Sequence, residues 1–211
     1  MSDLLFEIRV CESCGLRYPL QKGHSFGERC PHCLGKTRVA AGKVIHEEER
    51  ANEKPAKKRK AFHAVLLDNT RGACNVGSIL RSADGFGFDH VYLCGITPAP
   101  DNEAVTKTSL GAENMIPWST HKDAVKLAAG LKKEGWRIIA LEEGKGVKEI
   151  DKRLKTRFEK SALILGSEVT GVDPDLLALC DEMISIPMRG QKRSLNVAIA
   201  FSVAAFALKN S

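Results

Sequence analysis

No stretch of this 211-residue sequence is apolar for long enough to cross a bilayer, and the C-terminal segment that comes closest is too short. The first ten residues, MSDLLFEIRV, lack the basic region, apolar core and small-residue cleavage site of a secretion signal. Aromatic residues make up only 6%, whereas the apolar content of 43% is ordinary for a globular protein. We therefore expect a cytoplasmic protein without a membrane-spanning segment.

The glycine fingerprint of a dinucleotide-binding domain is also missing. Apolar segments that read as strands alternate with helical segments from residue 61 onward, which predicts an α/β fold with a mainly parallel sheet. A Rossmann fold would place G-x-G-x-x-G directly after the first strand, but the chain reads DNTRGACNVG there. The glycine-rich loops instead follow the first, fourth and fifth predicted strands.

The predicted elements have these boundaries. Strands are expected at 63–67, 90–94, 137–141, 162–165 and 183–186. Helices are expected at 76–85, 121–134, 174–179 and 194–209. The last helix is almost wholly apolar, so we expect it to be buried on nearly all sides.

Basic charge is concentrated in the first 60 residues, which hold 13 Lys and Arg against 8 Asp and Glu. The densest run is KPAKKRK, residues 54–60, at the end of an almost wholly polar segment, 43–60, that we interpret as a linker. Lys57, Lys58 and Arg59 are candidate phosphate contacts for RNA, although a solvated linker would have the same composition.

Four of the seven cysteines form a metal-binding pattern. Cys11 and Cys14 make one C-x-x-C pair, and Cys30 and Cys33 make a second after 15 intervening residues. This spacing predicts a four-thiolate zinc ribbon over residues 1–42, a segment too small to hold a core without its metal. Because the basic run follows it, we expect this ribbon to bind RNA. The alternative is a pair of disulfides, which the cytoplasmic expectation disfavours.

The other sulfur and imidazole groups have simpler interpretations. His24 and His32 are possible substitute ligands that a full set of thiols makes unnecessary. Cys74, Cys94 and Cys180 lie in or beside apolar stretches, and we expect them to be buried small hydrophobic residues.

Three segments combine a strand end with a polar loop and the start of a helix. The first contains Asn75, Gly77 and Arg81 as N-x-G-x-x-x-R, and the second contains Gly166, Glu168 and Gly171 as G-x-E-x-x-G. The third, IPMRGQKRSLNV, runs from Ile186 to Val197 and places polar and basic residues before an apolar helix. Free N–H groups at such a helix start suit a ligand that carries negative charge.

These three segments, in this order, resemble the signature motifs of the SpoU family of RNA ribose methyltransferases within the SPOUT superfamily. The resemblance covers about residues 61–211. It implies a parallel sheet with a C-terminal trefoil knot, a homodimer and methylation of a ribose 2′-hydroxyl in transfer or ribosomal RNA, of which we favour transfer RNA. The methyl donor would be S-adenosylmethionine, bound in a bent shape by Leu141, Gly166, Ile186, Met188 and Leu195. Plain core packing is the alternative role for the apolar members of this set.

The resemblance also implies roles for five polar residues. Arg81 would be catalytic, and because a guanidinium keeps its proton below a pH of roughly 12, we expect it to stabilise the developing alkoxide rather than act as a base. Asn75 would hold the acceptor side, and Glu168 would orient Arg81 and its loop, with a purely structural Arg81–Glu168 pair as the alternative. Ser194 and Asn196 would cap the last helix and contact substrate or donor.

Arg189, Lys192 and Arg193 precede that helix, and we expect them to bind RNA phosphates. Two other functions remain open from the sequence. One is an RNA-binding module that has lost catalysis, against which the complete set of polar motif residues argues. The other is methylation of a base, which the ribose-type motifs disfavour.

Overall fold

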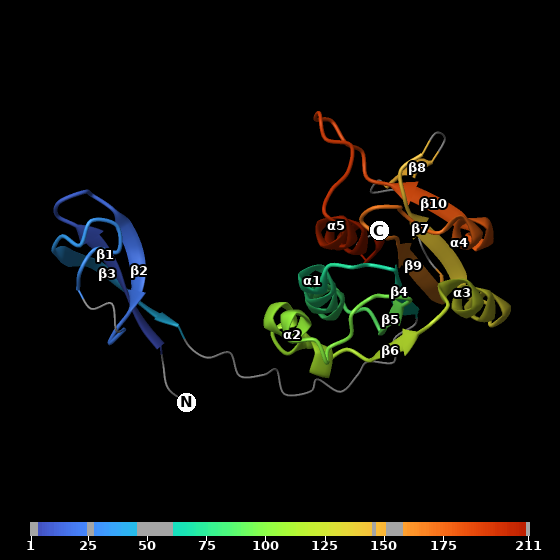
Figure 1. Ribbon diagram of the computed structural model, residues 1–211, viewed down its shortest axis with the longest axis horizontal. Coiled ribbons are helices and arrows are strands. Elements are labelled where there is room, and N and C mark those ends of the chain that lie inside the picture. Colours follow the sequence, from blue (N-terminus) through green and yellow to red (C-terminus); the bar gives the residue numbers. More distant parts are fainter. Residues whose placement is uncertain (1–3, 25–27, 46–60, 145–146, 151–157, 210–211) are drawn as a thin grey trace. The chain divides into compact units, whose positions relative to one another are not determined.

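The chain divides into two compact units, Met1–Lys58 and Arg59–Ser211. The computed structural model describes residues 4–24, 28–45, 61–144, 147–150 and 158–209 (Figure 1). The predicted RNA contacts Lys57, Lys58 and Arg59 lie outside these described residues.

The first unit is a three-stranded antiparallel sheet with the strand order β2-β1-β3. Its strands are β1 (Leu4–Cys11), β2 (Arg17–Gln21) and β3 (Thr37–Ile45). A register shift between Ile8 and Arg9 marks an irregularity where β1 pairs with β3. Strand β3 ends three residues beyond the expected end of the ribbon at residue 42, so the segment we interpreted as a linker begins inside a strand.

The second unit is built on a seven-stranded sheet with the order β6-β5-β4-β9-β7-β10-β8, in which every pair of neighbours is parallel. The strands are β4 (Phe62–Asp68), β5 (His90–Cys94), β6 (Trp118–His121), β7 (Arg137–Leu141), β8 (Lys148–Glu149), β9 (Lys160–Leu165) and β10 (Glu182–Ser185). Strand order by itself does not establish a trefoil knot, which stays a prediction.

Helices cover both faces of this sheet (Figure 1). On one face, α1 (Ala73–Gly85) packs between α2 (Glu103–Ser109) and α5 (Val197–Lys209). On the other face, α3 (Ala124–Lys133) lies beside α4 (Pro174–Leu179). A short 3₁₀ helix, η1 (Ala112–Asn114), follows α2. None of the helices among the described residues has both the length and the apolar content needed to span a membrane.

The sequence located the buried strands well but missed the small peripheral elements. Strands β5 and β7 and helix α4 have the expected bounds. Helix α2, strand β6 and the two-residue β8 were not expected. Strand β6 alternates exposed and half-buried residues in only four positions, and α2 buries only Val105 and Ser109, so neither carries a readable periodicity.

Helix α5 is less buried than its composition predicted. It begins at Val197 rather than Ser194, and it buries Ala198, Phe201, Ala204 and Ala205 against the core. On the opposite side, Ile199 is 54% exposed, Val203 40% and Phe206 59%. These residues recur at intervals of four and three, so they form one apolar stripe along the helix. The expectation of burial on nearly all sides was therefore wrong.

Candidate active site and metal centre

The ends of β7, β9 and β10 surround a cleft of about 360 Å³. Parallel strands bring the loops at their carboxyl ends to one edge of the sheet, which is the usual ligand site in open α/β sheets. The five residues predicted to bind the donor all line this cleft, namely Leu141, Gly166, Ile186, Met188 and Leu195. Ile186 is not part of β10, which ends at Ser185, and it belongs instead to the loop that follows.

The loop from Gly166 to Asp173 forms one wall of the cleft and folds back tightly on itself. Ser167 and Gly171 exchange two backbone hydrogen bonds, of 2.9 and 3.0 Å. A Cβ at Gly166 would lie 2.1 Å from the carbonyl carbon of Gly171, so no side chain fits there. Gly171 itself has φ +72°, a conformation that favours glycine. These two motif glycines therefore shape the loop.

Two carboxylates outside the predicted site hold the far end of this loop. Glu142, directly after β7, accepts a hydrogen bond from the backbone N–H of Val172 at 2.8 Å. Asp68, the last residue of β4, accepts one from the N–H of Asp173 at 3.1 Å. Burial raises the pKa of Asp68 above its ordinary value, although the hydrogen bonds that it accepts from Asp173 and Asn69 partly oppose that shift. Sequence reasoning missed both residues, and the available signal was a carboxylate at the carboxyl end of an apolar strand.

Glu168 projects from the same loop and binds the start of α1. Its carboxylate accepts hydrogen bonds from the N–H of Arg71 at 3.0 Å, the N–H of Gly72 at 3.1 Å and Nδ2 of Asn75 at 2.8 Å. Partial burial would raise the pKa of Glu168, but these hydrogen bonds to the charged form lower it below its ordinary value. The expected contact with Arg81 is absent within the described part of the chain, so Glu168 orients the loop and not the arginine.

Asn75 connects Glu168 to the start of α5. Its Oδ1 accepts a hydrogen bond from Nδ2 of Asn196 at 3.0 Å. Asn196 also caps α5, because its Oδ1 accepts from the N–H of Ala198 at 2.9 Å. The capping role predicted for Ser194 was wrong, since the helix begins at Val197, and Ser194 instead lines the cleft. One polar chain, Glu168–Asn75–Asn196, thus joins the three motifs.

Arg81 lies deeper in its helix than the sequence suggested. Helix α1 begins at Ala73, three residues before the expected start, which places Arg81 about two turns along it. Its side chain is exposed, has no polar partner among the described residues and does not line the cleft. One turn earlier, a Cβ at Gly77 would lie 2.0 Å from Oγ1 of Thr108. This motif glycine therefore lets α2 pack closely against α1.

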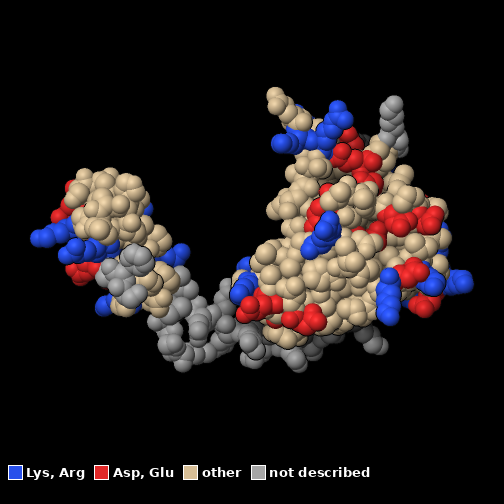
Figure 2. Space-filling model, in the orientation of Figure 1, with Lys and Arg blue, Asp and Glu red and all other residues tan. Residues whose placement is uncertain are grey.

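A basic loop leads from β10 to α5 and projects from the sheet edge (Figure 1). Its cations Arg189, Lys192 and Arg193 are all exposed, and Figure 2 shows Lys and Arg side chains gathered near this projection. The structure therefore brings these three predicted RNA contacts beside the cleft that Ser194 and Leu195 line.

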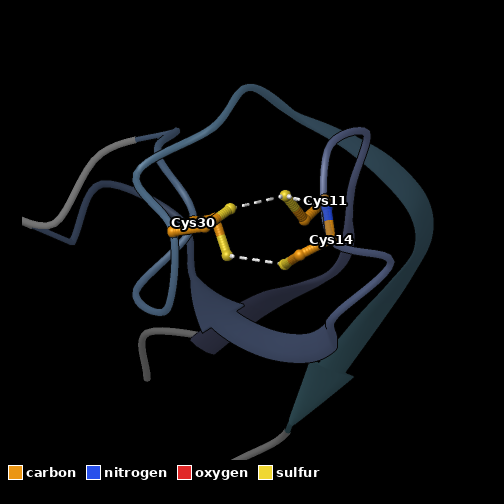
Figure 3. A group of neighbouring side chains, drawn as sticks. Cys11, Cys14 and Cys30 are labelled. Carbon is orange, nitrogen blue, oxygen red and sulfur yellow. Dashed lines mark hydrogen bonds between the residues drawn. The ribbon is translucent and has the colours of Figure 1, made fainter.

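The four paired cysteines of the first unit converge (Figure 3). The Sγ atoms of Cys11 and Cys33 are 3.4 Å apart, those of Cys14 and Cys30 are 3.7 Å apart, and all four lie within 4.8 Å of one another. Four sulfurs placed about 2.3 Å from a tetrahedral zinc ion would be separated by about 3.8 Å. The arrangement fits zinc, and both separations are longer than the roughly 2.05 Å of a disulfide bond, so the four thiols are free.

The backbone supports this metal centre. The N–H of Cys14 points to Sγ of Cys11 and the N–H of His32 to Sγ of Cys30, each at 3.4 Å. Such contacts stabilise thiolates, the form of cysteine that zinc binds. Neither His24 nor His32 belongs to the ligand cluster among the described residues.

The remaining cysteines follow the sequence expectation only in part. Cys94 is fully buried, Cys180 is half-buried and Cys74 is exposed. Burial raises the pKa of the Cys94 thiol to about 12 and that of Cys180 to about 11, so both stay protonated at neutral pH. The expectation that Cys74 is buried was wrong, because it lies on the outer side of the first turn of α1.

The cleft fits the donor expected from the resemblance. Its apolar walls include Leu165, Val197 and Ala200 beside the five predicted residues, which suits the faces of an adenine ring. Glu142 and Glu143 also line it, and carboxylates suit a ligand that carries a sulfonium and an ammonium group. The described residues thus offer both an apolar slot and anionic groups in one place.

Comparison with known proteins gives consistent matches. Residues 63–206 match the model of the SpoU rRNA Methylase family. The tRNA (guanosine(18)-2′-O)-methyltransferase of Thermus thermophilus is 30% identical over 160 residues, which cover 74% of this chain and 79% of that protein. The 23S rRNA (guanosine(2553)-2′-O)-methyltransferase RlmP of Bacillus subtilis is 33% identical over 168 residues, which cover 79% of this chain and 63% of that protein.

Solved structures match at the level of the fold. The SpoU methyltransferase AviRb from Streptomyces viridochromogenes, in complex with the cofactor AdoMet, aligns with a TM-score of 0.63 and 21% identity over 83% of this chain and 68% of that chain. The TrmH/SpoU tRNA modifying enzyme of A. aeolicus aligns with a TM-score of 0.63 and 23% identity over 72% of this chain and 76% of that chain.

Proposed function

Because this chain belongs to the SpoU rRNA Methylase family, we propose that it is an enzyme that methylates a ribose 2′-hydroxyl of transfer or ribosomal RNA, with S-adenosylmethionine as donor. The observation that carries the proposal is the polar chain Glu168–Asn75–Asn196, of which Glu168 and Asn196 line the cleft. It links all three family motifs through hydrogen bonds of 2.8 and 3.0 Å. The names of the two curated relatives, both RNA 2′-O-methyltransferases, support the same reaction.

The donor would bind in the cleft between the loops that follow β7, β9 and β10. Leu141, Ile186, Met188 and Leu195 would enclose the adenine, and the backbone of Gly166 would form part of the wall beside it. When bound, S-adenosylmethionine supplies an activated methyl group on a sulfonium, which is transferred as the sulfur–carbon bond breaks. The protein would contribute mainly by holding donor and ribose in line, which removes much of the entropic barrier.

Arg81 would act on the acceptor side. During transfer of the methyl group, the ribose 2′-hydroxyl releases its proton to water. Negative charge develops on its oxygen in the transition state. A guanidinium cannot take up that proton, but it can stabilise the charge and bind the neighbouring phosphate. Arg81 is exposed and has no polar partner within the described ranges, a position suited to meeting a ribose phosphate from outside the protein.

We place the RNA backbone on the basic loop, where Arg189, Lys192 and Arg193 would contact phosphates. Replacing all three by Ala is expected to weaken RNA binding and to make the remaining affinity less dependent on salt. An unchanged slope of log affinity against log salt would remove the loop from the RNA contact.

We infer that the active form is a homodimer that pairs through the apolar stripe of α5. Ile199, Val203 and Phe206 leave a continuous apolar strip exposed, and a second copy of this chain would bury it. Because Arg81 does not line the donor cleft of its own chain, a second subunit also offers a way to bring the arginine and a donor together.

The experiment that tests the function is methyl transfer from labelled S-adenosylmethionine to separate transfer RNA and ribosomal RNA pools, followed by digestion to nucleosides. A labelled 2′-O-methylnucleoside is the expected product, and the labelled pool identifies the substrate class. We favour transfer RNA as the substrate, and we expect the enzyme to act in the cytoplasm. Label on a base would contradict the ribose reaction, and no label with donor bound would favour the non-catalytic RNA-binding alternative.

A further inference from the structure

One face of the zinc ribbon carries an apolar strip flanked by three cations, one on β2 and two on β3. Antiparallel pairing places directly opposed residues on the same side of a sheet. The register therefore puts Arg17, Val10 and Arg38 in one cross-strand row, and Gln21, Phe6 and Lys43 in another. Between them lies a row of Pro19, Ile8 and Ala41. We call these nine residues the platform face.

All charged residues of the platform face are positively charged. Its three cations are Arg17, Arg38 and Lys43, and the strands bring no carboxylate to it. The strand residues Glu7 and Arg9 lie on the opposite face, where Arg9 is only 5% exposed and is ion-paired with Glu7 and Glu28. Among the described strand residues, the cation on one face is thus paired with carboxylates, and no carboxylate stands opposite the cations on the other.

The cations of the platform face are available to a ligand. Arg17, Arg38 and Lys43 are exposed and have no ion pair among the residues the structure describes. Adjacent strands lie about 4.8 Å apart, so Arg17 and Arg38 stand roughly 10 Å apart across Val10. This arrangement does not stabilise the ribbon itself, because like charges repel across the sheet.

The strip between the cations is apolar and ends in an aromatic ring. Phe6, Ile8 and Val10 are each half-buried, and none belongs to a buried core cluster of the described chain. Alternate residues of β1 place them along roughly 13 Å of one strand. Phe6 has Lys43 beside it, and Arg17 and Arg38 flank Val10 farther along the same strand. An aromatic ring on a sheet face with cations nearby is the arrangement that stacks bases and binds the backbone of a single nucleic-acid strand.

We propose that the platform face binds a single-stranded segment of the RNA substrate, with a base stacked on Phe6 and phosphates held by Arg17, Arg38 and Lys43. The inference rests on the proposed function, since it takes RNA to be the substrate. It assigns the ribbon to holding the substrate, while the second unit performs the reaction.

The test uses the full-length, zinc-loaded protein and compares two variants with a matched control. Arg17→Gln/Arg38→Gln removes two charges from the platform face, and Phe6→Leu removes the ring but keeps an apolar side chain. The control, Lys22→Gln/Arg29→Gln, removes two exposed charges from elsewhere on the ribbon. The probes are a fluorescein-labelled oligouridylate and an RNA duplex, each titrated at several salt concentrations. Zinc content and donor affinity are measured for every variant to show that both units remain folded.

The expected result is that each platform variant weakens oligouridylate binding roughly 10-fold. The double arginine variant should also lower the slope of log affinity against log salt by about 1.4, which corresponds to two phosphates on a single strand. The control should bind the single strand several-fold more tightly than either platform variant. Phe6→Tyr, which restores an aromatic ring, should bind like the wild type even if Phe6→Leu loses zinc.

Two outcomes overturn the proposal. One is a platform variant that binds the single strand no more weakly than the control, and the other is a loss confined to the duplex. Methyl-transfer assays on the same variants separate this result from the proposed function. Transfer with unchanged KM for RNA would reject the platform face and leave the reaction standing. A wild type that binds the strand through this face but transfers no methyl group would reject the reaction and leave the face standing.

Discussion

Asn196 donates a hydrogen bond from its Nδ2 to Oδ1 of Asn75 at 3.0 Å, although 121 residues separate the two in sequence. Each amide has a second fixed partner, because Asn75 donates to Glu168 and Asn196 accepts from the N–H of Ala198. Donor and acceptor roles are therefore determined along the whole chain of contacts. Aspartate at either position would place two acceptors face to face.

A double-mutant cycle with Asn75→Ala and Asn196→Ala should detect this link. We expect a coupling free energy of about 0.5–1 kcal/mol, the usual net contribution of one hydrogen bond. Urea unfolding can be followed by tryptophan fluorescence, since Trp118 and Trp136 both lie in the second unit. If the double variant loses the sum of the free energies of unfolding lost by the two single variants, the two helix starts are held independently.

Glu168 should make the free energy of unfolding depend on pH over a defined acidic range. Because its folded pKa is lowered, its charged form stabilises the fold above the ordinary value of 4.5, and this contribution is lost as the pH falls through the lower folded pKa. The wild type and Glu168→Gln should therefore differ in free energy of unfolding near neutral pH and converge in acid. A difference that stays constant over the same range would mean that the charge has no part in holding Arg71 and Gly72.

Arg81→Ala should lower the turnover number by at least about 100-fold, the scale for removing one group that stabilises transition-state charge. Donor affinity, measured by calorimetry, should not change, because the side chain does not line the cleft. Lys107→Ala, which removes another exposed cation from the same unit, is the control and should keep full activity. Near-normal turnover in Arg81→Ala would exclude the residue from the mechanism.

Removal of zinc should unfold the ribbon and spare the donor site. Among the described apolar residues of the ribbon, only Cys11 and Cys30 are buried, so we expect the metal to provide most of its stability. After chelation we expect a loss of strand signal in circular dichroism, with donor affinity of the second unit unchanged. One zinc ion per chain should restore the signal, and Cys14→Ser should not regain it.

Ile199→Glu/Val203→Glu should convert a dimer into monomers, because burying two carboxylates in an apolar interface is costly. Sedimentation velocity at several concentrations measures the change. Met115→Glu, also at an exposed apolar position of the second unit, should leave assembly unaltered. A wild type that sediments as a monomer at all concentrations would refute pairing through α5.

The sequence predicted the structure best where a residue type by itself indicates the local structure or ligand. Glycines marked the loop that begins at Gly166, and the cysteine spacing anticipated the sulfur cluster. It failed where position depended on distant partners. Nothing near Glu168 in sequence indicates that its partners are Arg71, Gly72 and Asn75, and the partnership of Glu142 with Val172 arises only when β7 and β9 pair. The composition of α5 also does not indicate which of its sides is exposed to solvent.

The loop from Gly166 to Asp173 has a thermodynamic consequence. It forms a wall of the donor cleft, and through Glu168 it also fixes the helix that carries Arg81. Glu142 and Asp68 hold its far end, so both ends of the loop are tied to other elements. Any donor that moves this loop therefore changes the affinity for RNA, and RNA must change the affinity for the donor by the same factor. The enzyme would then have a different affinity for RNA when the methylated cofactor is bound than when the unmethylated cofactor is bound.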